Sequence, residues 1–230
     1  RPRLDAAPLP FDEVALIGAR VATALHDLHR QHVIHLDIKP SNILFRAPTD
    51  GSACGTAVLV DFGLSRHDHL PDLLDEEFNL PMGTGPYMSP EQVQFVRNEP
   101  RSDLFALGVM LYHLTTGQRP FGAPSSVRGL RERLYKEPVP PRLHRPDCPG
   151  WLQEILLRCL EVDAAKRHPS AAHLAQDLLD PKHIRLTERA EKASQAGALK
   201  TFQRWFKAMG AEPSERGSAG AAAGEGARGF

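Results

Sequence analysis

The run His-Leu-Asp-Ile-Lys-Pro-Ser-Asn at residues 35–42 combines side chains that suit phosphoryl transfer. Its aspartate, Asp37, can orient and deprotonate a hydroxyl nucleophile, and Lys39 can hold the phosphate that is being transferred. The side-chain oxygen of Asn42 can bind Mg²⁺, and Asp61, which directly follows the apolar run AVLV and precedes Phe-Gly, offers a second oxygen ligand. These residues predict a magnesium-dependent phosphoryl-transfer site.

Both motifs are short, and each also has an interpretation without function. Asp61 can open a turn and Asp37 can be an ordinary loop carboxylate, because short patterns also arise by chance. Either motif alone supports the two interpretations about equally. The two motifs together, in this order and each beside a predicted strand, favour phosphoryl transfer.

Predicted secondary structure places both segments between helices. Apolar side chains at Val14, Ile17 and Val21 recur at helical spacing and predict a helix over residues 11–31. Residues 33–45 combine short β-rich pieces with a Pro-containing loop. Further predicted segments are a strand at 57–60, a loop-like stretch at 61–91, a buried helix at 104–114, a Pro-rich stretch without regular structure at 137–150, and helices at about 151–160 and 170–179.

Five separately spaced motifs give the chain a resemblance to a known family. They are His35–Asn42, Asp61–Gly63, the stretch GTGPYMSPE at Gly83–Glu91, Asp103 in the predicted buried helix, and Arg167 in the run AAKRHPS. In this order they resemble the larger C-terminal lobe of the eukaryotic-type Ser/Thr protein kinases, over about residues 5–180. The resemblance implies a kinase domain at 1–180, represented by its C-lobe only. That lobe would be mainly α-helical with short β-strands.

The resemblance also assigns roles to individual residues. In the complete enzyme Asp37 would be the catalytic base, Lys39 would hold the γ-phosphate, and Asn42 and Asp61 would bind Mg²⁺. ATP and Mg²⁺ are the implied cofactors, with Leu44 forming the floor of the adenine pocket. Structural support would come from His35, Phe62 and Gly63, from Asp103 as a brace of the catalytic loop, and from Arg167 paired with Glu91.

The acceptor implied by the resemblance is a Ser or Thr hydroxyl of a protein. Lys39, two residues after Asp37, resembles Ser/Thr kinases, whereas tyrosine kinases typically carry Arg further along this loop. Thr84 supports the same acceptor, because in Ser/Thr kinases the hydroxyl at this position contacts the catalytic Asp and Lys. Thr84 is therefore counted among the expected catalytic residues.

Position 36 departs from the family, because Leu36 stands where most members have Arg. In those members the Arg pairs with a phosphorylated residue of the activation loop. The corresponding loop here, residues 66–83, contains no Ser, Thr or Tyr. We expect no activation by phosphorylation of this loop. Its acidic residues, which fit a solvated loop face, are Asp68, Asp72, Asp75, Glu76 and Glu77.

The segment before His35 is the larger departure. It holds no glycine-rich loop, and Lys39 is the first lysine of the chain. A kinase needs a glycine-rich loop and a strand lysine to clamp ATP. We therefore expect the chain by itself to bind ATP poorly, and the missing N-lobe to come from the same gene or, less favoured, from another chain.

Two other functions stay open at this point. A small-molecule phosphotransferase shares the catalytic loop and the later Asp, but such enzymes lack the segment GTGPYMSPE. A non-catalytic scaffold or pseudokinase fits the absence of the nucleotide-clamping lobe. It does not fit the presence of the residues expected to carry phosphoryl transfer, which are Asp37, Lys39, Asn42 and Asp61.

Composition excludes some partners. Lys plus Arg total 28 and Asp plus Glu total 28, which argues against a general nucleic-acid binder. No apolar run approaches the roughly 20 residues that cross a bilayer, so no stable membrane insertion is expected. Three widely spaced cysteines predict a reducing, cytoplasmic location. Residues 181–209 are predicted as a helical extension, and the Gly/Ala-rich residues 210–230 as disordered.

Histidines recur along the chain without a metal-binding pattern. His26, His29 and His32 are spaced by three on the predicted first helix with no carboxylate nearby, and this favours a surface or packing role over metal binding. His67 and His69 lie in the acidic loop and are given the same interpretation.

Overall fold

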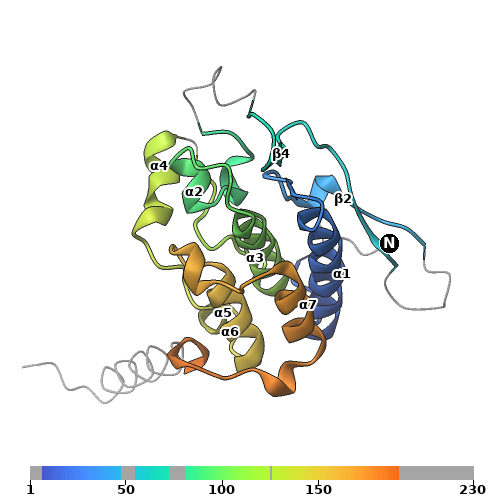
Figure 1. Cartoon of the computed structure of the whole chain (residues 1–230). Helices are drawn as coiled ribbons and strands as arrows, with labels where there is room; N and C mark the ends of the chain where they lie inside the picture. The colour runs from blue at the N-terminus through green and yellow to red at the C-terminus, as the bar shows by residue number, and fades with distance from the viewer. Residues whose placement is uncertain (1–6, 48–54, 73–80, 125, 192–230) are drawn as a thin grey trace, which may run out of the picture. The chain divides into compact units, whose positions relative to one another are not determined.

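A computed structural model describes residues 7–47, 55–72, 81–124 and 126–191, all within one compact unit that ends at Gln195 (Figure 1). It is mainly helical with a few short strands, which confirms the expected fold class. The helical extension predicted over 181–209 is described only to residue 191, with a 3₁₀ turn at Pro181–His183 and helical residues at 188–191. The predicted disordered tail, 210–230, lies outside the described residues.

Two helices form the centre of the lobe. Helix α1, Phe11–His29, buries an apolar stripe that includes Val14, Ile17 and Val21. Helix α3, Arg101–Thr116, is buried on nearly all sides and ends at Gly117, whose φ of 72° suits glycine. Both helices match their predicted positions, because their apolar spacing decides which face enters the core.

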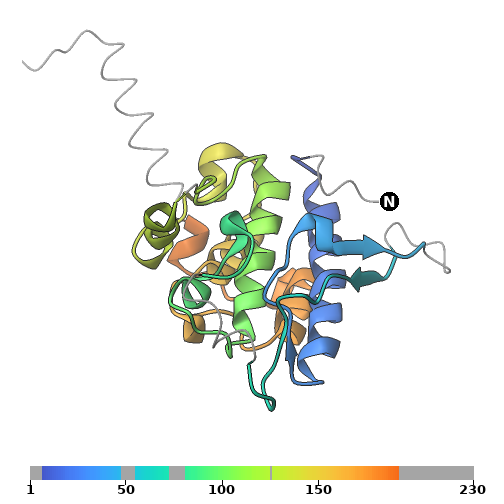
Figure 2. The ribbon, with the colours of Figure 1, turned by 90° about the horizontal axis from the view of Figure 1, so that it is seen from above.

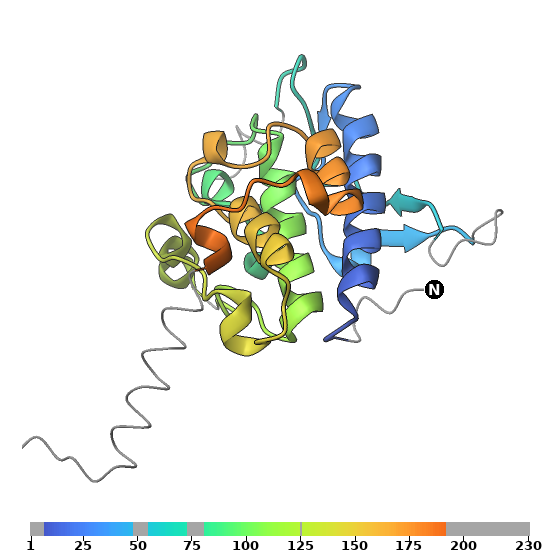
Figure 3. The ribbon, with the colours of Figure 1, turned by 90° about the horizontal axis from the view of Figure 1, so that it is seen from below.

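Helix α7, Ala171–Leu179, packs along α1, and helix α6, Gly150–Cys159, packs on α3 (Figure 3). Gly18 of α1 allows the close approach: a Cβ there would lie 2.8 Å from a methyl of Leu111 and 2.9 Å from a methyl of Leu178. The remaining short helices are α2 at Pro90–Val93, α4 at Val127–Arg131 and α5 at Pro141–His144.

Within the described ranges, four short strands form two antiparallel pairs beside α1 (Figure 2). Strand β1, Val33–Ile34, pairs with β4, Arg66–His67. Strand β2, Ile43–Phe45, pairs with β3, Ala57–Leu59, with Leu44 opposite Val58. These pairings bring the two predicted motifs together, because β2 follows the run 35–42 and β3 precedes Asp61.

Two predicted loops contain regular structure. The Pro-rich stretch 137–150 was expected to have none, and this is wrong, because α5 lies within it. Its helix begins with Pro141, and proline is tolerated in the first helical turn, where its missing N–H has no intrahelical partner. The stretch 61–91 contains β4, a 3₁₀ turn at Gly85–Tyr87 and the first half of α2.

Cys148 and Cys159 are buried free thiols, and burial raises their pKa values to about 11 and about 12. They are therefore protonated and unreactive at neutral pH. None of the helices in the described ranges combines the length and apolar character that a bilayer crossing demands.

Candidate active site

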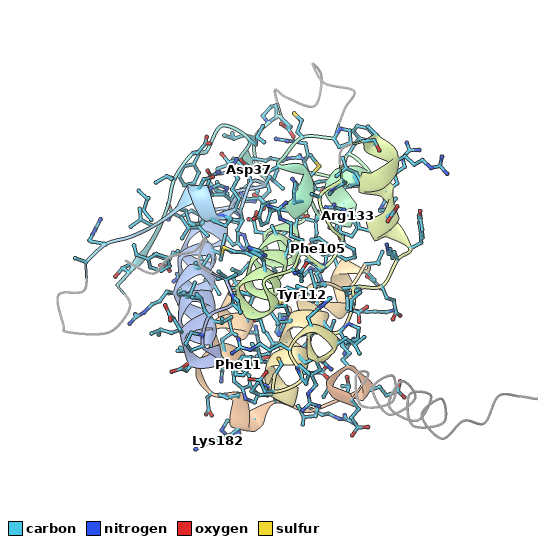
Figure 4. The ribbon with its side chains drawn as sticks, turned by 180° about the vertical axis from the view of Figure 1, so that it is seen from behind. Phe11, Asp37, Phe105, Tyr112, Arg133 and Lys182 are labelled. Carbon is cyan, nitrogen blue, oxygen red and sulfur yellow. The ribbon has the colours of Figure 1, made fainter. Side chains whose placement is uncertain are left out.

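Asp37 lies at one end of the helical core, and Phe11 and Lys182 lie at the other (Figure 4). It belongs to the loop between β1 and β2, whose last part is a 3₁₀ turn at Pro40–Asn42. The loop is therefore held by β1 at one end and by β2 at the other, and the first turn of α3 contacts it through Asp103.

A single carboxylate holds the backbone of this loop. Asp103, in the first turn of α3 and 1% exposed, accepts hydrogen bonds from the N–H of His35 at 2.9 Å and of Leu36 at 2.8 Å. Leu36 has a φ of 62°, a conformation that is unfavourable for a leucine. The two hydrogen bonds from the Asp103 carboxylate therefore stabilise a strained turn that precedes Asp37 directly.

The Asp37 carboxylate is the centre of a polar network. Its Oδ1 accepts from the Thr84 hydroxyl at 2.7 Å and from the Thr84 N–H at 3.1 Å. Its Oδ2 accepts from Lys39 Nζ at 2.5 Å and from the Asn42 amide at 3.1 Å. Lys39 Nζ also donates to the Thr84 hydroxyl at 2.9 Å. The structure thus brings together all four residues that the sequence proposed as catalytic.

Opposing effects act on the pKa of Asp37. Burial raises it, but the hydrogen bonds from Lys39 and Thr84 and the positive charge of Lys39 outweigh burial and lower it below its ordinary value. The carboxylate is therefore ionised at neutral pH and able to accept a proton. We expect a base function of Asp37 to be lost only as the pH falls through a pKa that lies below the ordinary value of an aspartate.

Asn42 and Asp61 lie at the same end of the β2–β3 pair. The backbone carbonyl of Asn42 accepts from the N–H of Val60 at 3.0 Å, so Asp61 is one residue beyond the paired segment. Asp61 is exposed with a φ of 64°, and its Oδ1 accepts from the N–H of Gly63 at 3.4 Å. An amide oxygen and a carboxylate are hard oxygen donors, which fits Mg²⁺ better than softer metals.

Some of the other predicted site residues near Asp61 are buried in the core, and others are exposed at the surface. His35 is buried, its Nε2 lies 3.2 Å from the carbonyl oxygen of Val60, and its ring centroid lies 5.0 Å from that of Phe62. Phe62 and Leu44 are each 46% exposed. Two large apolar side chains thus stand exposed on the side of the lobe that carries the candidate site.

Buried Arg167 forms an ion pair with the partly exposed Glu91, with Arg167 NH2 2.6 Å from Glu91 Oε1. The guanidinium of Arg167 also donates to the backbone carbonyls of Arg101 and Glu161, at 2.9 Å each. It therefore ties the start of α3 and the loop after α6 to α2. The pair fixes the end of the segment that carries Thr84.

The sequence interpretation missed several contacts. His29 Nε2 lies 2.9 Å from Asp103 Oδ2, so its side chain supports the loop brace. Gln92 donates to the carbonyls of Leu36 and Met82, and with Ser89 it forms a capping box at the start of α2. The spacing of Ser89 and Gln92 is a recognisable capping signal. Sequence carries no comparable signal for the contact of His29 with a residue 74 positions away.

A mainly helical lobe with a few short strands is the fold expected of a protein kinase domain. A family model for the protein kinase domain matches residues 4–179. The chain therefore belongs to the protein kinase domain family.

Bacterial Ser/Thr kinases are among its relatives. The chain is 35% identical over 200 residues to the serine/threonine-protein kinase pkn3 of Myxococcus xanthus, covering 84% of this chain and 36% of that protein. It is 35% identical to PkaA of Streptomyces coelicolor, covering 74% of this chain and 30% of the relative. It is 30% identical to PknB of Mycobacterium leprae, covering 75% and 26%. The chain thus spans only about a quarter to a third of the length of these relatives.

Proposed function

We propose that this chain is the catalytic lobe of a Ser/Thr protein kinase, which transfers the γ-phosphate of ATP to hydroxyls of protein substrates. The observation that carries the proposal is the ionised Asp37 carboxylate held between Thr84 and Lys39. A carboxylate so placed can orient a hydroxyl and take its proton at the moment of transfer.

Each residue of the network has a role in this proposal. Asp37 accepts the proton of the acceptor hydroxyl, and Lys39, whose ammonium bridges Asp37 and Thr84, neutralises charge on the phosphate. Asn42 and Asp61 would hold Mg²⁺, which would neutralise the charge on the phosphates of ATP. Leu44, exposed on β2, would contact the adenine once a nucleotide-binding lobe covers this face.

Two observations favour Ser or Thr as the acceptor. Lys39 contacts both Asp37 and Thr84, the arrangement that the resemblance implies for Ser/Thr kinases. The relatives named above are all Ser/Thr kinases by name. A small-molecule phosphotransferase is disfavoured because Glu91, which pairs with Arg167, lies in the segment GTGPYMSPE that those enzymes lack.

The proposal is tested by measuring the transfer of labelled phosphate from ATP to an acceptor. The protein assayed is the longest form of the chain that shows activity, called the longest active form below. Peptides that differ only in having Ser, Thr or Tyr at one position are offered together with small hydroxyl acceptors such as an aminoglycoside. We expect labelling of the Ser and Thr peptides alone. Labelling of the Tyr peptide or of the aminoglycoside would overturn the acceptor assignment.

The nucleotide-binding lobe is proposed to lie outside these 230 residues, in the same protein or, less favoured, in another chain. The scaffold alternative rests on the same observation, because no glycine-rich loop precedes Lys39, the first lysine. We expect ATP with Mg²⁺ to shift the melting temperature of the 230-residue chain by less than about 1 °C, since a ligand stabilises only a state that it binds. A clear rise with ATP and Mg²⁺ would contradict this expectation.

An internal carboxylate is proposed to take the place of a loop phosphate. Arg97, 5% exposed, donates from Nε to Asp72 at 2.6 Å and from NH2 to the carbonyl of Leu64 at 3.0 Å. Arg66 NH1 lies 3.8 Å from the same carboxylate. A buried charge-assisted pair therefore already anchors this loop, and Leu36 supplies no charge for a phosphate.

We expect phosphatase treatment to leave the kinase activity unchanged and Asp72→Ala to lower it about tenfold, because the substitution leaves Arg97 buried without its partner. The matched control is Asp147→Ala, which removes a carboxylate that is 69% exposed. Activity is measured on the longest active form. A loss of activity on phosphatase treatment, or an Asp72→Ala variant as active as the Asp147→Ala control, would contradict this prediction.

A further inference from the structure

Three side chains from two distant segments meet outside the candidate active site. His32 lies in the turn after α1, and Asp68 and His69 directly follow β4. We call this group the His32 cluster. Its side chains are accessible to a ligand, being 50%, 39% and 63% exposed for His32, Asp68 and His69.

The distances within the His32 cluster fit a tetrahedral metal ion. Asp68 Oδ1 lies 3.3 Å from His32 Nδ1 and 3.6 Å from His69 Nε2, and all three atoms lie within 4.8 Å of one another. Bonds of about 2.0–2.1 Å in tetrahedral geometry place neighbouring ligand atoms about 3.3–3.4 Å apart. The edge from Asp68 to His32 therefore already has the required length, the edge from Asp68 to His69 is slightly longer, and rotation of the two exposed imidazoles would adjust the remaining distances.

The backbone holds the two segments in this register. The N–H of Asp68 donates to the carbonyl of His32 at 2.9 Å, one residue beyond the β1–β4 pair. The His32 and His69 rings lie with centroids 3.9 Å apart and planes at 32°. The N–H of His69 donates to His67 Nδ1 at 3.3 Å, which fixes His67 beside the group. Part of the ordering cost of binding is therefore already met by the fold.

We propose that the His32 cluster binds a divalent metal ion, Zn²⁺ by preference. The ligands are His32 Nδ1, Asp68 Oδ1 and His69 Nε2, with a fourth position for water. Two imidazoles and one carboxylate match the donors that zinc takes, whereas Mg²⁺ prefers oxygen alone. The ion would join the end of α1 to the loop that follows β4, beside a strand pair only two residues long.

The proposal differs from the expectation drawn from spacing alone. His29, the last residue of α1, contacts Asp103 instead, with its Nε2 2.9 Å from Asp103 Oδ2. The partners of His32 come from a segment 36 and 37 residues later in the chain, and only the β1–β4 pairing brings them near. The spacing of residues within one helix therefore cannot predict this arrangement.

The test is Zn²⁺ binding to the full 230-residue chain, measured by competition with a chromophoric chelator and without nucleotide or substrate. Nucleotide-free binding keeps the result independent of the proposed kinase function. His32→Ala and His69→Ala remove one ligand each. The matched control is His183→Ala, because His183 forms an exposed ion pair with Asp180 at 3.1 Å and is absent from the cluster. All measurements are made in an Asp61→Asn background, which removes the proposed magnesium ligand.

We expect one Zn²⁺ per chain, with affinity reduced on the order of tenfold or more by each ligand substitution and unchanged by His183→Ala. Zn²⁺ at about a hundred times its dissociation constant should raise the melting temperature by about 5–10 °C, and at the same Zn²⁺ concentration His69→Ala should reduce that rise to about half or less. Failure to bind Zn²⁺, or equal weakening by His183→Ala, would overturn the proposal. Circular dichroism of each variant without metal verifies that it is folded.

Discussion

Replacing Asp103 with alanine is expected to lower the free energy of unfolding by about 3–5 kcal/mol. The Asp103 side chain is fully buried and accepts hydrogen bonds from the N–H groups of His35 and Leu36, and His29 Nε2 lies 2.9 Å away. Alanine would leave both N–H groups buried without an acceptor, next to a leucine at a φ of 62°. Urea denaturation followed by circular dichroism measures the change.

The matched control for this prediction is Asp27→Ala, which removes an exposed carboxylate from α1. It should change stability by less than about 0.5 kcal/mol. Asp103→Asn should fall between the two, because an amide keeps one acceptor oxygen but loses the charge. A cost for Asp103→Ala no larger than that of the control would show that the carboxylate is not what holds the catalytic loop.

The two central helices could be predicted because the apolar spacing that determines each of them lies within one segment of the chain. The apolar spacing of α1 and the continuous apolar run of α3 each fix a buried surface within one segment. Lys39 and Asn42 were predictable as neighbours of Asp37 for a similar reason, since all three belong to one short loop. Residues whose contacts lie within a few positions leave a signal in the sequence.

Contacts between distant segments left no such signal. The pairs Arg97–Asp72 and His29–Asp103 depend on how the strands and helices are placed, and no spacing rule relates their members. Strands β1 and β4 are two residues long, too short to show alternation. Helix α5 is not predictable from the density of prolines around it, because proline disfavours a helix interior, whereas Pro141 lies in the first turn, where proline is favourable.

The proposed role of Asp37 predicts a second large effect. Asp37→Asn should lower kcat by about 10²–10⁴-fold, because an amide of nearly the same shape cannot accept the proton of the acceptor hydroxyl. The KM for ATP with Mg²⁺ should change little, since Asn42 and Asp61 are untouched. The single carbonyl oxygen of the variant can accept either from Thr84 or from Lys39 and Asn42, while the amide nitrogen faces the other donors. The rest of the lobe packs without this side chain, so we expect the variant to fold with a lowered melting temperature.

The most direct test of the account is therefore the rate of phosphate transfer to a Ser/Thr peptide by the longest active form, with and without Asp37→Asn. Asp147→Asn, an exposed substitution of the same chemistry, is the control, and melting temperatures are compared in parallel. We predict a loss of at least about a hundredfold in kcat for Asp37→Asn alone, at an assay temperature well below the melting temperature of the variant. A rate within threefold of the parent protein would contradict the assignment of Asp37 as the base.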